Sequence, residues 1–262
     1  ICAESGHINA HETGALESVG HKCLILPTSN GKITAKQVDT LIQNHYNDIN
    51  AEHTVQPGIV YISFPTESGT LYSKQELTEL YTVCQKHNIP LFIDGARLGY
   101  GLMAKKNDVT FKDIANLCDV FYIGGTKVGA LFGECIVILN DLYKKDFRYS
   151  IKQHGGMLAK GRMLGIQFEE LFKDNRYLTI SKHAIDMADL LTEGFQSKGY
   201  HFYFPAETNQ LFPIFENTKL EELSKEFAFT PWAKVDETHT AVRFVTSFAT
   251  KRENVEYLLT KI

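Results

Sequence analysis

"GIVYISFPTESGTLYSKQELTELYTVCQKHNIPLFIDGA", residues 58–96, is the stretch that best indicates the fold. It starts and ends with apolar runs, 58–64 and 90–96, which have the length and the Ile, Val and Phe content of buried strands. Between these runs, residues 73–88 begin at Ser73, a favoured N-cap residue, and repeat apolar side chains at helical spacing. Strands that alternate with helices in this way are typical of an α/β fold with a largely parallel sheet.

The same alternation extends over the first 140 residues. Further strands are predicted at 22–27, 119–125 and 134–140, and a further helix at 33–46. Beyond residue 150 the pattern changes to a long helical stretch with strand-like runs after it, at 160–199, 200–205, 209–216 and 241–248. We therefore predict a large α/β domain over residues 1–155 and a small α+β domain over residues 156–262.

The composition excludes several classes of partner. The chain has 262 residues, 44% of them hydrophobic and 22% charged, and a net charge of −4, as in ordinary globular proteins. Because neither sign of charge dominates, we expect neither a nucleic acid nor a membrane surface as a partner. No apolar stretch approaches the length that spans a bilayer.

The five cysteines are scattered, and no CxxC occurs, so neither a zinc site nor a redox pair is indicated. We interpret them as buried small side chains in a reducing compartment, and the absence of a signal peptide agrees with a cytoplasmic location. The chain starts without a methionine inside a strand-like stretch. We therefore expect it to be part of a longer protein.

The first candidate for chemistry is Asp94, which follows four apolar residues and is expected at the carboxyl end of a buried strand. In open α/β sheets, ligands bind at this edge. A buried carboxylate needs a cation or several hydrogen-bond donors, and Arg97 could supply the cation. The alternative is an Asp94–Arg97 pair that only ties a loop to the sheet, and the spacing does not decide between them.

The second candidate is Lys127, which follows the strand-like run 119–125 and two glycines in a nearly uncharged stretch. An apolar site lowers the pKa of a lysine and makes it a nucleophile toward carbonyl groups. An isolated lysine more often extends from a loop into water, and the stretch by itself favours that interpretation. A P-loop is excluded because no GxxxxGK[ST] occurs.

Two weaker candidates lie near the ends of the chain. His7, His11, Glu12 and His21 do not match HExxH, so we expect no metal site of that kind, although His7 is predicted at a strand edge. Arg243 lies in an alternating strand, where it faces either solvent or a cleft in which it offers a bidentate fork for a carboxylate.

Four stretches together resemble the threonine aldolase and β-eliminating lyase group of fold-type I pyridoxal-phosphate enzymes, in particular low-specificity L-threonine aldolases. They are GHINAHETGALE (6–17), FIDGARLGYG (92–101), YIGGTKVGALFGE (122–134) and VRFVTSFAT (242–250). The resemblance covers essentially the whole chain. It implies a three-layer, aspartate aminotransferase-like α/β fold with a mostly parallel sheet and a small C-terminal α+β domain, from which this chain lacks an N-terminal part.

The resemblance also implies a cofactor, pyridoxal 5′-phosphate, and roles for the candidate residues. Lys127 binds the cofactor through a Schiff base, and Asp94 keeps the pyridine nitrogen protonated. His7 stacks on the ring and Thr126 contacts the phosphate. Arg97 and Arg243 together grip the carboxylate of an amino-acid substrate.

The implied reaction is the cleavage of L-threonine or L-allo-threonine to glycine and an aldehyde by a carbon–carbon lyase. The resemblance further implies a homodimer or homotetramer with shared active sites. β-Elimination or transamination of another amino acid remains an alternative enzyme activity. A non-catalytic, truncated homologue is the alternative without chemistry.

The sequence departs from the family pattern at three points. Glu67 follows Thr66 where many relatives carry a histidine, so the base is Glu67, His7 or a bound water. Leu158 stands where the family has an arginine, whose contact could come from Lys160 or Arg162. The upstream phosphate-binding loop of the family lies outside this chain.

Overall fold

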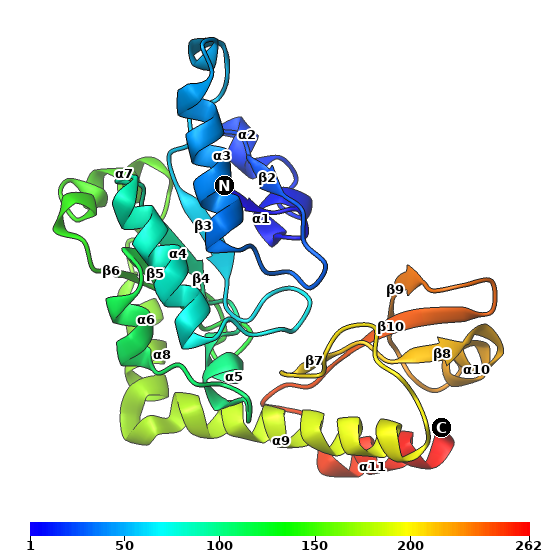
Figure 1. Ribbon diagram of the computed structural model, residues 1–262. Coiled ribbons are helices and arrows are strands. Elements are labelled where there is room, and N and C mark those ends of the chain that lie inside the picture. Colours follow the sequence, from blue (N-terminus) through cyan, green and yellow to red (C-terminus); the bar gives the residue numbers. More distant parts are fainter.

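The computed structural model describes all 262 residues, and its first half is built on a four-stranded sheet (Figure 1). The strands are adjacent in chain order: β3 (Val60–Ser63), β4 (Leu91–Asp94), β5 (Val120–Gly124) and β6 (Glu134–Ile138). The first three are parallel and β6 is antiparallel to β5. The predicted mostly parallel sheet is therefore confirmed, with strands slightly shorter than the apolar runs.

A two-stranded parallel sheet continues this arrangement beside β3. It consists of β1 (Cys2–Ala3) and β2 (Ile25–Leu26), and the Tyr61 amide of β3 donates to the Ile1 carbonyl at 2.9 Å. The short helices α1 (His7–Ala10) and α2 (Ala15–Ser18) follow β1. The strand predicted at 22–27 thus forms over two residues only.

Three helices pack on one face of the sheet: α3 (Ala35–Asn47), α4 (Lys74–Lys86) and α6 (Phe111–Asn116) (Figure 1). Their buried residues share one hydrophobic cluster with the inward side chains of the strands. Each helix begins with a complete capping box, at Thr34, Ser73 and Thr110. The predicted N-cap at Ser73 is confirmed.

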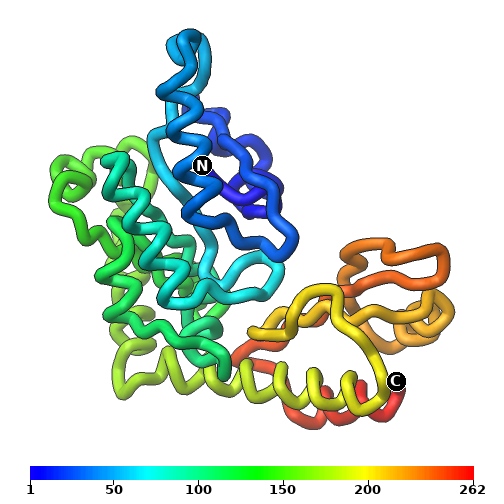
Figure 2. Tube along the Cα trace, in the orientation of Figure 1, coloured from blue at the N-terminus to red at the C-terminus, as the bar shows by residue number.

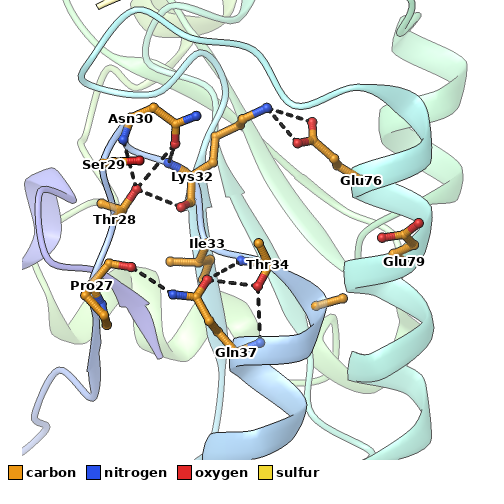
Figure 3. A pocket seen from close by; sticks show the side chains of 11 residues that line it. Pro27, Thr28, Ser29, Asn30, Lys32, Ile33, Thr34, Gln37, Glu76 and Glu79 are labelled. Atoms are coloured by element: carbon orange, nitrogen blue, oxygen red, sulfur yellow. Dashed lines mark hydrogen bonds and ion pairs between the residues drawn. The ribbon is translucent and has the colours of Figure 1, made fainter.

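Polar contacts tie the loop before α3 to the first turns of α3 and α4 (Figure 3). The Lys32 amine donates to both carboxylate oxygens of Glu76, at 2.6 and 2.9 Å, and the Gln37 amide nitrogen donates to the Pro27 carbonyl at 2.8 Å. These groups line a polar cavity of about 340 Å³. They bind one another, so we assign the cavity a structural role.

Four further helices complete the first part and its connection to the second, and only the last of them is long. They are α5 (Leu98–Met103), α7 (Phe147–Gln153), α8 (Arg162–Phe172) and α9 (Arg176–Ser197), with short 3₁₀ turns at Ala51–His53, Asp141–Tyr143 and Lys173–Asn175. Figure 2 shows α9 running from the first part to the second, where the C-terminus lies. No helix combines the length and the apolar character that crossing a bilayer requires.

The second part is an antiparallel sheet backed by helices. Its strands are β7 (Gln210–Leu211), β8 (Ile214–Glu216), β9 (Thr230–Lys234) and β10 (His239–Val245), and its helices are α10 (Asn217–Leu223) and α11 (Arg252–Lys261). The central strand β10 pairs with all three others. A second hydrophobic cluster joins this sheet to α9 and α11.

The two hydrophobic clusters meet along α9, where Ile185 belongs to the first and Met187 to the second. The predicted division at 155/156 stays a prediction. The strand predicted at 200–205 is wrong, because only a single bridge forms there, between Phe202 and Pro213. Strand β9, which contains Pro231, was not predicted. The structure accommodates this proline because β9 is an edge strand paired only with β10.

Gly95 and Gly124 are required by the close approach of the loops after β4 and β5. A Cβ at Gly95 would overlap the Tyr122 carbonyl, and one at Gly124 would overlap the Ala96 carbonyl. Because both obstacles are backbone atoms, we expect Gly95→Ala to lower the free energy of unfolding by about 3 kcal/mol. The control is Gly165→Ala in α8, which meets nothing within 4 Å and should gain about 0.5–1 kcal/mol. Urea unfolding of both variants tests this, and similar stabilities would contradict it.

Candidate active site

The candidate residues of the first part meet at the carboxyl edge of the parallel strands. Asp94 ends β4, Glu67 lies in the loop after β3, and Lys127 lies in the loop after β5. His7 begins α1 directly after β1. Parallel strands bring these loops to a single edge, which is where ligands bind in open α/β sheets.

Asp94 is 8% exposed, and its carboxylate is held by three hydrogen-bond donors. The Tyr61 hydroxyl donates to Oδ2 at 2.7 Å, while the Tyr122 hydroxyl and the Ala96 amide, the latter at 2.9 Å, donate to Oδ1. The partner considered from the sequence, Arg97, does not form this contact. The loop after β4 turns at Gly95 and directs Arg97 into the neighbouring cleft instead.

Lys127 lines both cavities of the site and is exposed to solvent there. Its backbone carbonyl accepts a hydrogen bond from the Tyr100 hydroxyl, which fixes the turn. Partial desolvation by the surrounding residues lowers the pKa of the Lys127 amine, and the nearby positive charge of Arg97 lowers it further. The side chain therefore has a neutral, nucleophilic form at lower pH than an ordinary lysine.

Glu67 is oriented by two donors that bind the same carboxylate oxygen. The His7 amide donates to Oε1 at 2.8 Å and the Ser63 hydroxyl at 2.7 Å. The His7 ring is held in turn, because its Nδ1 lies 2.5 Å from Oε1 of Glu12. The second oxygen of Glu67, Oε2, has no such partner and is available to a ligand.

Arg97 and Arg243 converge from the two parts of the chain on one cleft. Burial lowers the pKa of Arg97, and the charge of Arg243 lowers it further. Nε of Arg243 is buried and has no hydrogen-bond partner, and its guanidinium carbon lies 5.8 Å from the centre of the Trp232 ring. Two close guanidinium groups without an acidic partner are arranged for an anionic ligand.

Two adjoining cavities contain these residues. The outer one has a volume of about 690 Å³, and the inner one, which reaches Asp94, has about 110 Å³. Both are lined by His7, Glu67, Arg97 and Lys127. The outer volume is in the range of small-molecule sites.

Several residues singled out in the sequence lie elsewhere. Thr126 lines neither cavity, and its hydroxyl donates to the Gly133 carbonyl at 3.3 Å. Lys160 and Arg162 are exposed and also line neither cavity. His21 borders a separate apolar cavity. No group of three or more His, Cys, Asp or Glu side chains is arranged to hold a metal ion.

Other residues of the site were not found in the sequence. Gln210 and Trp232 complete the outer cleft from β7 and β9, and Tyr61 and Tyr122 hold Asp94. The two tyrosines could have been predicted from the alternation of side chains along the strands, since each lies on the same face of the sheet as Asp94, on a neighbouring strand. Gln210 and Trp232 had none, because nothing in the sequence places β7 and β9 opposite the first part.

The two adjoining cavities provide an amine with a lowered pKa, a buried carboxylate, a second carboxylate with a free oxygen, and two guanidinium groups without an acidic partner. The amine can attack a carbonyl carbon, and the guanidinium pair can bind a carboxylate. The free oxygen of Glu67 can accept a proton.

The chain belongs to the beta-eliminating lyase family, whose model matches residues 1–218. Among its relatives is the low-specificity L-threonine aldolase of Pseudomonas aeruginosa, 32% identical over 229 residues, an alignment that covers 85% of this chain. The chain spans 64% of the length of that relative.

Solved structures agree with this assignment. A threonine aldolase of Leishmania major superimposes with a TM-score of 0.95 at 42% identity, over 99% of this chain and 75% of that one. A variant aspartate aminotransferase of Thermus thermophilus shares the fold, with a TM-score of 0.61 at 13% identity over 91% of this chain and 63% of that one. The aspartate aminotransferase-like fold predicted from the sequence is confirmed.

Proposed function

We propose that the protein is a pyridoxal-phosphate-dependent lyase that cleaves L-threonine and L-allo-threonine to glycine and acetaldehyde. The observation that carries the proposal is that Lys127 and Arg97 line two adjoining cavities, of which the inner one reaches Asp94 and the outer one reaches Arg243. The threonine aldolases of Pseudomonas and Leishmania support the choice of substrate.

The residues present fit this cofactor. Lys127 offers an amine for its aldehyde, and Asp94 offers a buried carboxylate for its protonated ring nitrogen. The buried, unpartnered Nε of Arg243 fits the carboxylate of an amino acid. When bound, pyridoxal phosphate supplies an electron sink for the bond that is broken at the α-carbon.

The side chains of the cleft then have distinct tasks. Arg97 and Arg243 bind the substrate carboxylate and thereby orient the bond to be broken. Glu67 accepts the proton of the β-hydroxyl group at its free oxygen, Oε2, while its other oxygen is held by His7 and Ser63. The His7 ring, fixed by Glu12, forms one wall of the site.

A substrate panel tests the proposal. The full-length protein with pyridoxal phosphate is given L-threonine, L-allo-threonine, L-serine or L-cysteine, and glycine, acetaldehyde, pyruvate and ammonia are measured. Glycine and acetaldehyde from the two threonines support the aldol cleavage. Pyruvate and ammonia would show β-elimination instead, and the absence of any product would favour a non-catalytic homologue.

We also propose a homo-oligomer, a dimer or tetramer with shared active sites, in a reducing compartment such as the cytoplasm. Leu131 and Phe132, four and five residues after Lys127, are 88% and 46% exposed, which supports a contact with a second copy beside the site. None of the five cysteines is paired, and four are buried. Sedimentation of the protein tests the oligomeric state, and a monomer would contradict it.

A further inference from the structure

The carboxylate of Asp94 is buried without a cation in contact with it. An isolated buried carboxylate is unfavourable, and several hydrogen bonds to the charged form are the alternative means of stabilising it. Asp94 has three such bonds, and two come from the tyrosine hydroxyls of Tyr61 and Tyr122. The environment of the ion is therefore built mainly from these two side chains.

The strand register explains why the tyrosines reach Asp94. Tyr61 pairs with Phe92, and Ser63 with Asp94, so the side chains of Tyr61 and Asp94 lie on the same face of the sheet. Tyr122 approaches this face from β5 on the other side of β4. The Tyr61 ring stacks on Phe92, with ring centres 5.0 Å apart and planes inclined by 5°, which fixes its hydroxyl.

Both tyrosines are permanent donors. Burial raises the pKa of Tyr61 and of Tyr122, and the charge of Asp94 raises both further. Neither hydroxyl loses its proton in the range where proteins are stable. Each therefore donates to Asp94 at every working pH.

The three bonds are distributed unequally between the two oxygens. Oδ1 accepts from Tyr122 and Ala96, whereas Oδ2 accepts from Tyr61 only. A carboxylate oxygen accepts about two hydrogen bonds, so Oδ1 is filled and Oδ2 has one acceptor position left. Oδ2 of Asp94 can therefore accept one further hydrogen bond from an N–H group.

We propose that Tyr61 and Tyr122 are positioning residues that hold Asp94 with one open acceptor site, on Oδ2, for the protonated ring nitrogen of the cofactor. The inference rests on the proposed function, because it needs a cofactor with such a nitrogen. It assigns Tyr61 and Tyr122 an indirect role: they act through Asp94 and fix which oxygen meets the ring.

The experiment compares two ligands in titrations monitored by absorbance: pyridoxal phosphate and its analogue in which carbon replaces the ring nitrogen. The variants are Tyr61→Phe and Tyr122→Phe, which keep the rings and remove only the hydroxyl groups. Tyr149→Phe is the control, since Tyr149 is 72% exposed and lines neither cavity. Thermal unfolding is recorded for every protein, so that affinities are compared between folded samples.

We expect each variant to bind pyridoxal phosphate about tenfold more weakly, the effect of losing one hydrogen bond to a charged group. Affinity for the analogue should stay within about twofold of the wild-type value, because it lacks the nitrogen that Asp94 meets. Equal losses for both ligands, or no loss for either, would overturn the inference. Wild-type protein that binds neither ligand would instead contradict the proposed function.

Discussion

Lys127→Ala is expected to abolish both the visible absorbance band of the bound cofactor and the lyase activity, the latter by about a thousandfold or more. The reason is that Lys127 is the amine that lines both the inner cavity at Asp94 and the outer cleft at Arg243. The measurement is an absorbance spectrum with added pyridoxal phosphate, followed by the rate of glycine formation.

The lowered pKa of Lys127 adds a pH dependence to this prediction. Covalent attachment needs the neutral amine, so uptake of the cofactor should be half complete at a pH below about 10.4, the ordinary pKa of lysine. Arg97→Gln removes a positive charge that favours the neutral form. It should therefore raise the pKa of Lys127 and move the midpoint of uptake to higher pH.

Lys145→Ala provides the control, because Lys145 is exposed and lines neither cavity. It should keep the absorbance band and the rate of the wild-type protein. A Lys127→Ala protein that still develops the band, and in which borohydride reduction then fixes the cofactor to another lysine, would show that a different amine binds the cofactor.

The sequence predicted best those site residues that directly follow an apolar strand. The apolar runs predicted β3, β4, β5 and β6, and the position of Asp94 after four apolar residues placed it at the carboxyl edge. Such positions depend on a few consecutive residues, because a strand's end and its loop are fixed locally. The role of Lys127 as the cofactor-binding amine came from the family resemblance. The residues around Lys127 had favoured an ordinary lysine that extends into water.

Contacts between distant segments could not be predicted in this way. The residues around Arg97 do not indicate that its neighbour in the cleft is Arg243, because the two approach only when β10 packs beside the first part. Only the family resemblance paired these two arginines. Likewise, the sequence suggested Arg97 as the partner of Asp94, whereas tyrosines from two adjacent strands fill that role. Partners across a sheet depend on register, and the register is set by the whole sheet rather than by spacing along the chain.

Arg243→Leu is expected to raise the KM for L-threonine by about a hundredfold or more, the usual effect of truncating one partner of a desolvated charge pair. Affinity for pyridoxal phosphate should not change, because Arg243 lines the outer cleft and not the inner cavity at Asp94. Arg243→Lys keeps the charge but loses the planar fork, so it should recover only part of the affinity. Arg252→Leu, which removes a surface ion pair with Glu256, is the control and should leave KM unchanged.

The same variant should make the free protein more stable, by about 1 kcal/mol. In the wild type, Nε of Arg243 is buried without a partner, and the charge of Arg243 lies close enough to Arg97 to lower its pKa. Leucine removes both the unpaired donor and the repulsion, and it can still pack against Trp232. Urea unfolding without substrate measures this gain. Higher stability together with weaker substrate binding would show that Arg243 serves ligand binding and not the stability of the fold. Lower stability with an unchanged KM would mean that Arg243 only joins the two parts of the chain.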